Sequence, residues 1–341
     1  MTDGETLLAV EGLRTGIHTP RGVVRAVDDV SFTLEHGRCL GIVGESGSGK
    51  TMLARSVLGL VPTTAVREGS ARLNGEELLG RSRKQMRAVL GTQLSLVPQD
   101  PMTSLNPVRR VGDQLMEPLR HHLTLGKRQA YERAIELLDS VRIPDPARRM
   151  LEYPYQLSGG MRQRIVIAAA IACDPGLVFA DEPTTALDVT IQAQILSLLD
   201  RMRKERNVAI VLVTHNLGVV AHHTDEIIVM YAGRVVERAP TQILFTNMRM
   251  PYTRALMASL PNMEQPVHTR LTAIPGRPPD LITPTSGCRF APRCELAQSD
   301  CWAKEPPLAP GSTPGHEYRC WHPVDGPVRP RRTVPAAVAD R

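Results

Sequence analysis

The chain has 341 residues, 42% of them hydrophobic and 4% aromatic, with a formal net charge of +6 at pH 7. Its length predicts one large domain with a smaller addition, and its longest apolar runs reach only about half the ~20 residues of a membrane span, which argues against a transmembrane helix. The acidic start MTDGETLLAVEG lacks the apolar stretch of a secretion signal. Basic residues are not interleaved with aromatics, which argues against nucleic-acid binding. We therefore expect a cytoplasmic protein that reaches a membrane only through partner proteins.

The first predicted elements are strands. Residues 7–16 and 26–34 alternate apolar and polar positions around a turn, which is the pattern of an antiparallel pair. Cys39–Val43 is a short apolar strand, a loop rich in Gly and Ser follows it, and the spacing of Thr51–Leu60 predicts a helix. The N-terminal part therefore combines an antiparallel pair with a strand–loop–helix unit.

Helices and buried strands are predicted next. Residues 107–150 are largely helical in pattern, with charges spaced three and four apart. Leu177–Ala180 and Val208–Val213 are short apolar runs flanked by turn signals, as in buried parallel strands. A last apolar pair, Glu226–Tyr231 and Arg234–Glu237, turns at Ala-Gly. The pattern indicates an α/β protein.

The composition changes near Ala239, where the chain becomes rich in Pro and loses its periodic segments. We therefore predict a main domain over residues 1–240 and a small irregular C-terminal extension over residues 241–325. Residues 326–341 are rich in Pro, Arg and Ala, a composition typical of a disordered tail.

Residues 44–51 fit the pattern G-x-x-x-x-G-K-[ST] between a predicted strand and a predicted helix. Glycines let successive N–H groups turn toward phosphate oxygens, and the helix adds the positive end of its dipole. Lys50 is placed to neutralise the β- and γ-phosphates, and Thr51 to coordinate Mg²⁺. The alternative, a Gly-rich turn with an exposed lysine, fits this context poorly. The expected nucleotide-binding residues are Gly44, Ser46, Gly47, Ser48, Gly49, Lys50 and Thr51.

Two carboxylates follow the predicted strand Leu177–Ala180. Asp181 is placed to hold Mg²⁺ through water, and Glu182 to polarise the water that attacks the phosphate. Two acids at a strand end can also cap a turn, but a phosphate loop in the same chain favours the catalytic interpretation.

Leu157–Met161 (LSGGM) precedes a helical run and resembles the LSGGQ signature of ABC ATPases, with methionine in the fifth place. Ser158, Gly159 and Gly160 at a helix N-terminus form an anion-binding nest, although Ser-Gly-Gly alone is also an ordinary N-cap. Further matches in the family's order are Gln99 to the Q-loop glutamine that contacts Mg²⁺ and water, Asp188 to the D-loop, and His215 to the switch histidine. The chain therefore resembles an ABC ATPase over residues 44–215.

The resemblance implies a P-loop ABC ATPase fold, with a RecA-like parallel sheet, an antiparallel β-layer and a helical subdomain at about residues 100–175. It implies catalytic roles for Glu182, His215 and Gln99, with Gln99 also near Mg²⁺. It also implies a head-to-tail dimer, in which each ATP lies between residues 44–51 of one subunit and residues 158–160 of the other.

The adenine contact departs from the family pattern. ABC subunits usually stack the base on an aromatic side chain of the first β-layer, but the corresponding region, Gly16–Thr19, has none. Ile17 or His18 is therefore expected to contact adenine, and selectivity for the base is expected to be weak.

Several segments resemble the ATP-binding subunits of bacterial dipeptide/oligopeptide importers, namely Gln99–Pro107, Ser158–Arg164, Pro251–Leu256, Ile274–Asp280 and Gly287–Trp321. This implies an ATPase that powers peptide import from the cytoplasmic face of the cell membrane. The implied partners are a second ATP-binding subunit, expected to be a paralogue, two membrane permeases and an extracytoplasmic solute-binding protein. Related subunits import nickel or other small solutes, so the cargo stays open. A non-transport ABC ATPase is less favoured, because the chain has neither a long coiled-coil insertion nor a second cassette.

Four cysteines with the spacing C-x5-C-x6-C-x18-C lie in the extension: Cys288, Cys294, Cys301 and Cys320. Disulfides are disfavoured in the cytoplasm, structural zinc uses tighter Cys pairs, and common ferredoxin spacings differ. The spacing alone therefore leaves a four-cysteine metal site of open identity, or unligated thiols. The importer resemblance implies a structural [4Fe–4S] cluster on these four residues, because some subunits of that family carry one here.

Overall fold

The computed structural model describes residues 5–185, 188–259, 274–283 and 285–325. The predicted disordered tail, residues 326–341, lies outside them. The strands are β1 (Thr6–Thr19), β2 (Gly22–Glu35), β3 (Cys39–Val43), β4 (Ala65–Leu73), β5 (Glu76–Glu77), β6 (Leu94–Val97), β7 (Leu177–Asp181), β8 (Ala209–Thr214), β9 (Glu226–Tyr231), β10 (Arg234–Pro240), β11 (Ala309–Pro310) and β12 (Glu317–Tyr318).

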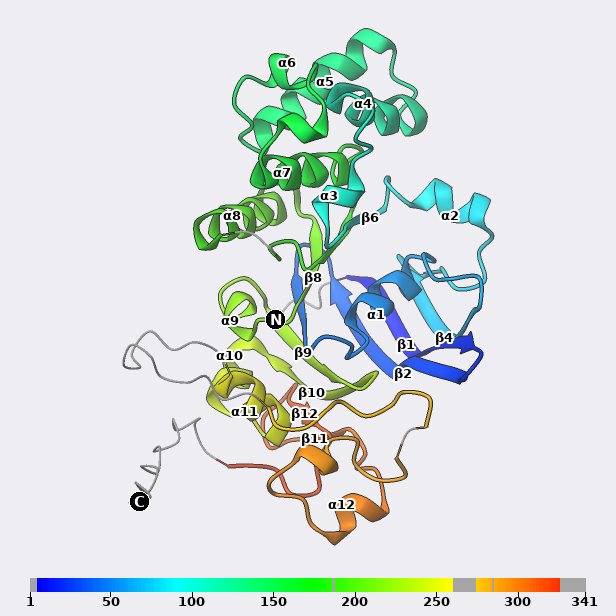
Figure 1. The fold of residues 1–341 in the computed structure, drawn as a ribbon, viewed down its shortest axis with the longest axis vertical. Coiled ribbons are helices and arrows are strands. Elements are labelled where there is room, and N and C mark those ends of the chain that lie inside the picture. Colours follow the sequence, from blue (N-terminus) through cyan, green and yellow to red (C-terminus); the bar gives the residue numbers. More distant parts are fainter. Residues whose placement is uncertain (1–4, 186–187, 260–273, 284, 326–341) are drawn as a thin grey trace, which may run out of the picture.

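The helices lie mainly between β6 and β7 and after β10. They are α1 (Lys50–Val57), α2 (Arg83–Val89), α3 (Pro101–Ser104), α4 (Val111–His122), α5 (Lys127–Ser140), α6 (Pro146–Arg149), α7 (Gly159–Ala170), α8 (Val189–Arg206), α9 (Leu217–Val220), α10 (Thr241–Thr246), α11 (Pro251–Ala258) and α12 (Ser299–Ala303), with short 3-10 turns at Pro154–Gln156 and Ala291–Arg293. Figure 1 shows α4 to α7 at one end of the molecule and α12 at the other. Within the described residues, no helix combines the length and apolar character that a membrane crossing needs.

The larger sheet has the strand order β11-β12-β10-β9-β3-β8-β7-β6. The strands β9, β3, β8, β7 and β6 run parallel, and β10 adds antiparallel to β9. All residues of β3, β7 and β8 are buried, which explains their continuous apolar sequences. The carboxyl ends of these parallel strands share one edge of the sheet, and the loops after them carry the predicted site residues.

The smaller sheet is antiparallel, with the order β2-β1-β4-β5. The pair β1 and β2 is longer than predicted, because both strands continue to the turn at residues 20–21. Together the two sheets and the helical region confirm the predicted α/β fold with an antiparallel β-layer. The strand β4 was not predicted, because most of its residues are half-buried or exposed and its sequence alternates weakly.

The C-terminal segment, residues 274–325, packs on the larger sheet. The strand β12 pairs with β10, at Glu237 with Tyr318. Glu237 is fully buried and its carboxylate lies 2.9 Å from Nε2 of buried His316. Phe290 packs its ring against Tyr231 and Tyr252, with centroids 5.3 Å apart in both pairs. The segment therefore shares the main core, which explains how a Pro-rich sequence without apolar periodicity is ordered.

Candidate nucleotide-binding and hydrolysis site

The loop between β3 and α1 has the backbone of a phosphate cradle. Gly44 and Gly49 have φ angles of +155° and +102°, and a Cβ at either would lie 2.2 Å and 2.3 Å from backbone oxygens of Met230 and Ala26. Only glycine fits there. Ser48 Oγ is buried and has no hydrogen-bond partner in the described residues. An unpaired buried hydroxyl in such a loop fits a site that receives phosphate oxygens.

Lys50 begins α1, and its ammonium group turns back over the loop. Nζ donates to the carbonyls of Gly44 at 2.8 Å and Glu45 at 3.0 Å. Burial lowers the pKa of Lys50, while the carboxylates of Glu182, Asp181 and Glu45 oppose this shift. Lys50 is 4% exposed, so its ammonium group is poorly solvated, and a bound anion would stabilise its charge.

Thr51 and Asp181 meet at the edge of the sheet. The Thr51 hydroxyl, in the first turn of α1, donates to Oδ1 of Asp181, the last residue of β7, at 3.0 Å. Burial raises the pKa of Asp181, and the nearby Glu182 charge adds to the rise, while the Thr51 bond lowers it. A hydroxyl beside a carboxylate is a set of hard oxygen donors that fits Mg²⁺.

Glu182 is the meeting point of the predicted catalytic residues. Its Oε2 accepts a hydrogen bond from Gln99 Nε2 at 3.1 Å and lies 3.2 Å from His215 Nδ1. Thr185 Oγ1 donates to the same oxygen at 2.8 Å. Glu182 has a φ of +47°, an unfavourable backbone conformation for a non-glycine residue, as is frequent at functional sites. Three residues from three separate loops thus converge on one carboxylate oxygen.

The signature residues lie away from this cluster. Ser158 caps α7, and its Oγ accepts from Met161 N at 3.3 Å. Figure 1 shows α7 among the helices at one end, whereas α1 lies beside β1 and β2. Within the described residues, no hydrogen bond or ion pair joins residues 158–160 to residues 44–51. Ser158 and Gly159 are exposed, and Gly160 is half-buried.

The remaining predicted site residues, in the D-loop and at the expected adenine contact, are exposed or half-buried. Asp188 is exposed and caps α8, where its Oδ1 accepts from Ile191 N at 2.9 Å. The D-loop residues 186–187 lie outside the described residues. Ile17 is half-buried on β1 opposite Val24 of β2, and His18 beside it is exposed. The role of Ile17 at adenine stays a prediction.

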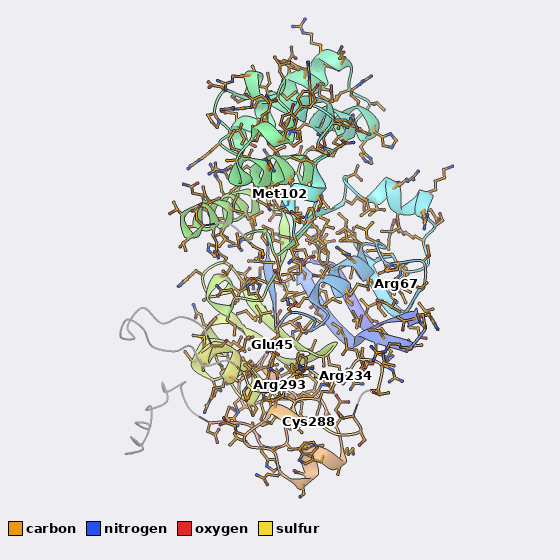
Figure 2. All side chains as sticks on the ribbon, in the orientation of Figure 1. Glu45, Arg67, Met102, Arg234, Cys288 and Arg293 are labelled. Carbon is orange, nitrogen blue, oxygen red and sulfur yellow. The ribbon has the colours of Figure 1, made fainter. Side chains whose placement is uncertain are left out.

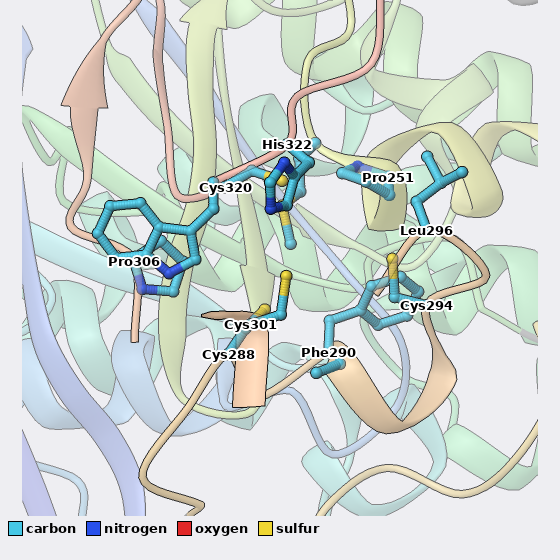
Figure 3. A pocket seen from close by; sticks show the side chains of 12 residues that line it. Pro251, Cys288, Phe290, Cys294, Leu296, Cys301, Pro306, Cys320 and His322 are labelled. Atoms are coloured by element: carbon cyan, nitrogen blue, oxygen red, sulfur yellow. The ribbon is translucent and has the colours of Figure 1, made fainter. Parts of the chain in front are cut away.

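The four cysteines of the extension are gathered around one hollow, although three segments carry them (Figure 3). Apolar side chains complete the lining: Met250, Pro251, Phe290, Ala291, Leu296, Pro306 and Trp321. All four are free thiols. Among the described residues, the one group of three ligand atoms within 4.8 Å of one another is formed by Asp300, Cys301 and His322 at this hollow. Trp321 lines the hollow, whereas Trp302 is 54% exposed and does not.

The surroundings of the hollow raise the pKa of three of its cysteines and so disfavour their thiolate form when no cation is bound. Burial raises the pKa of Cys288, and repulsion from Cys301 and Cys294 adds to it. Burial likewise raises the pKa of Cys320 to about 12, again with contributions from the other thiols. Backbone N–H groups point at three of the sulfurs, those of Cys288, Cys294 and Cys320. A cation held by all four would offset the repulsion, and such N–H groups are typical around cysteine-ligated clusters.

The sequence analysis did not identify the residues of later segments that bind Glu45 of the phosphate loop. Arg293 forms an ion pair with Glu45, at 2.6 Å from Nη1 to Oε2, and Glu45 N donates to the Tyr252 hydroxyl at 2.8 Å. Glu45 occupies one of the variable positions of the loop pattern, and its partners lie more than 200 residues away. A glutamate inside a phosphate-binding loop was the available signal, because a carboxylate there requires a partner.

Two family models match the chain. Residues 27–185 match the ABC transporter model, and residues 236–301 match the model of the oligopeptide/dipeptide transporter C-terminal region. The first contains the phosphate loop and both carboxylates, and the second contains three of the four cysteines.

Similar proteins cover nearly the whole length. Over 319 residues the chain is 46% identical to the oligopeptide transport ATP-binding protein OppD of Salmonella typhimurium, with 94% of each chain covered. It is 47% identical to a probable peptide ABC transporter ATP-binding protein of Sinorhizobium fredii, over 93% of this chain and 95% of that one. A solved dimeric ATP-binding cassette with ADP and Pi is 25% identical, has a TM-score of 0.62, and matches over 69% of this chain and 99% of its own.

Proposed function

The chain belongs to the ATP-binding subunits of the oligopeptide/dipeptide ABC transporter family, and we propose that it hydrolyses ATP to drive the import of short peptides across the cytoplasmic membrane. It works as a peripheral subunit on the cytoplasmic face, where two permeases hold it. An extracytoplasmic solute-binding protein delivers the peptide to the permeases. Its ATPase partner is a second subunit of the same family, proposed to be a paralogue.

The phosphate loop binds the nucleotide. Backbone N–H groups of residues 44–51 and the Ser48 hydroxyl receive the phosphate oxygens, and Lys50 moves from its two carbonyl partners to the β- and γ-phosphates. Mg²⁺ neutralises developing charge on the phosphates when it is bound. Thr51 and Asp181 would hold the ion, and Gln99 would contact it.

The observation that carries the proposed chemistry is the Glu182 carboxylate, shared by Gln99 and His215 one residue after Asp181. Glu182 accepts a hydrogen bond from the attacking water and orients its lone pair toward the γ-phosphate. Gln99 and His215 fix the carboxylate before nucleotide arrives, and His215 donates to the γ-phosphate once Glu182 holds the water. Pre-positioning of this kind lowers the entropic part of the barrier.

A second subunit completes each site. Ser158, Gly159 and Gly160 leave an exposed helix N-terminus with free N–H groups, suited to the γ-phosphate held by the partner's phosphate loop. Asp188 is exposed at the N-terminus of α8 and is proposed to cross the dimer interface. Closure of the dimer on ATP is passed to the permeases through residues 99–107, and hydrolysis resets it.

Reconstitution tests this function. The chain should be purified with its neighbouring permeases and paralogous ATPase and placed in liposomes with the solute-binding protein. We expect phosphate release to rise when a short peptide is present and labelled peptide to enter the vesicles only with ATP. Nickel-dependent stimulation with no response to peptides would favour the small-solute alternative. ATP hydrolysis that ignores the permeases would contradict the transport function.

The four cysteines are proposed to hold a structural [4Fe–4S] cluster. Their gathering in one apolar hollow, the N–H groups aimed at three sulfurs and the mutual repulsion of their thiolates support a cationic group there. Within these described residues, no three of the four sulfurs lie within 4.8 Å of one another.

Metal analysis decides the point. Protein purified without oxygen should be brown and contain about four irons per chain. Cys294→Ser should remove the colour and make the C-terminal segment sensitive to protease. Cys173 is a buried thiol of the main core, so Cys173→Ser should keep the colour and the protease resistance. Stoichiometric zinc without iron would contradict the cluster and keep the ligands. The absence of any metal would contradict both.

A further inference from the structure

An arginine of the C-terminal segment reaches into the phosphate loop. Arg293 binds the Glu45 carboxylate with both terminal nitrogens, Nη1 to Oε2 at 2.6 Å and Nη2 to Oε1 at 2.9 Å. Figure 2 shows the two residues next to each other, above Cys288. The Arg293 side chain is 3% exposed. A bidentate pair of this kind is the strong form of an arginine–carboxylate contact.

The rest of the guanidinium is also fixed. Nε donates to the Pro275 carbonyl at 2.8 Å, Nη2 to the Ile274 carbonyl at 3.3 Å, and Nη1 to the Tyr231 hydroxyl at 3.2 Å. The hydrogen bonds with Glu45 raise the pKa of Arg293 above its usual range, so it stays charged. The arginine therefore has one fixed position, determined by the docked segment.

Glu45 transmits this position to the cradle. Its carbonyl accepts from Lys50 Nζ at 3.0 Å and from Ser48 N at 3.1 Å, and its own N–H donates to the Tyr252 hydroxyl. A shift of the Glu45 backbone would thus displace the lysine and the buried serine that face the phosphates. The Glu45 carboxylate also matters for binding, because an unpaired negative charge in the loop would repel the triphosphate.

We propose that Arg293 is a positioning residue of the ATP site, which neutralises and orients Glu45 so that the docked C-terminal segment sets the affinity of this chain for ATP. The inference rests on the proposed function only in that residues 44–51 bind ATP. It requires neither a permease nor a metal in the cysteine hollow.

The test measures the dissociation constant of Mg·ATP for the full-length chain by titration calorimetry, without turnover. Arg293→Ala should weaken binding by about tenfold or more, the effect of roughly 1.4 kcal/mol or more from a half-buried carboxylate left without its partner. Glu45→Gln removes the charge that Arg293 neutralises and serves as the second background for the Arg293 substitution. Adding Arg293→Ala to Glu45→Gln should then change the constant by no more than about twofold.

A matched control separates positioning from docking. Arg319 also precedes a cysteine and ties the segment to the sheet, through Nε to the Val235 carbonyl at 3.1 Å, but it does not contact the phosphate loop. Arg319→Ala should leave the ATP constant unchanged. An equal loss with Arg319→Ala, or an equal loss from Arg293→Ala in both Glu45 backgrounds, would show a docking effect and overturn the proposal.

Folding is checked by circular dichroism. If Arg293→Ala does not fold, Arg293→Lys, which keeps the charge and loses the bidentate geometry, takes its place and should show an intermediate constant. Unchanged affinity in a folded Arg293 variant overturns the inference alone. A wild-type chain that does not bind ATP would instead overturn the proposed function.

Discussion

The Thr51 hydroxyl donates a 3.0 Å hydrogen bond to the Asp181 carboxylate, although 130 residues separate the two along the chain. The bond joins the first turn of α1 to the end of β7, so the oxygen donors proposed for Mg²⁺ are assembled before nucleotide binds. Lys50 and Glu182 are the sequence neighbours of these two residues, and substitutions at them should separate nucleotide binding from catalysis.

Glu182→Gln should keep ATP binding and lower turnover of the assembled transporter by about 10²–10⁴-fold, the usual contribution of a general base. The amide fills the same space beside Gln99 and His215 but cannot accept the proton of the attacking water. Phosphate release and ATP affinity are measured together. Lys50→Ala is the contrasting variant and should lose nucleotide binding itself. Wild-type turnover in Glu182→Gln would remove the role assigned to this carboxylate.

Because each site needs two subunits, the isolated chain should hydrolyse ATP slowly, at a rate that rises more than linearly with protein concentration. Ser158→Arg should block hydrolysis at the partner's phosphate loop, since the arginine fills the nest that receives the γ-phosphate. Its own ATP binding should persist, which calorimetry would verify. A fully active species that elutes as a monomer would argue against the dimer.

Ile17→Tyr should tighten ATP binding by about 0.5–1.5 kcal/mol if this position lies against adenine, because the ring restores stacking. Successive residues of a strand face opposite sides, so His18→Tyr is the matched control. A gain at His18 alone would assign the base to that residue. Strong preference for ATP over GTP with no effect of either variant would place the base elsewhere.

Asp28→Asn should destabilise the fold by about 3 kcal/mol at pH 7, because it removes the buried carboxylate shared by Arg289 and Arg234 and leaves both arginines paired with Glu305 alone. Burial raises the pKa of Asp28, but its bonds with the two arginines outweigh this and lower it overall. Its contribution is therefore complete above the unfolded pKa of about 3.9 and disappears as pH falls through the folded value.

Urea unfolding at several pH values measures this effect. The difference in unfolding free energy between wild type and Asp28→Asn should be constant near neutrality and shrink below about pH 4. Asp29→Asn, an exposed neighbour paired with Arg14, is the control and should change stability by less than about 1 kcal/mol. A difference that does not depend on pH would contradict the assignment.

Local patterns carried most of the fold and of the candidate site. The strand β3 and the phosphate loop are visible in a few consecutive residues, and Gln99, Glu182 and His215 each follow a buried parallel strand, so their convergence at one sheet edge could be predicted. The strand β4 could not, because one mostly exposed face leaves little apolar signal.

Contacts between distant loops could not be predicted either. Arg293 and Glu45 are 248 residues apart, and neither position has a pattern that indicates the other. The cysteines could be grouped by their clustering, but the apolar lining from Met250 and Pro251 depends on how α11 packs against the segment. Such pairings are set by tertiary packing, which a single sequence does not show.

The pairing of β12 with β10 also protects the chain from self-association. In a chain ending at Pro240, the seven-residue β10 would be an open edge, with unpaired N–H and C=O groups able to recruit a strand of another molecule. In the native chain the outermost strand is β11, which has two residues, one of them Pro310 without an N–H. Over the described residues, the C-terminal segment thus ends this side of the sheet with a strand of two residues, which offers few unpaired groups to a strand of another molecule.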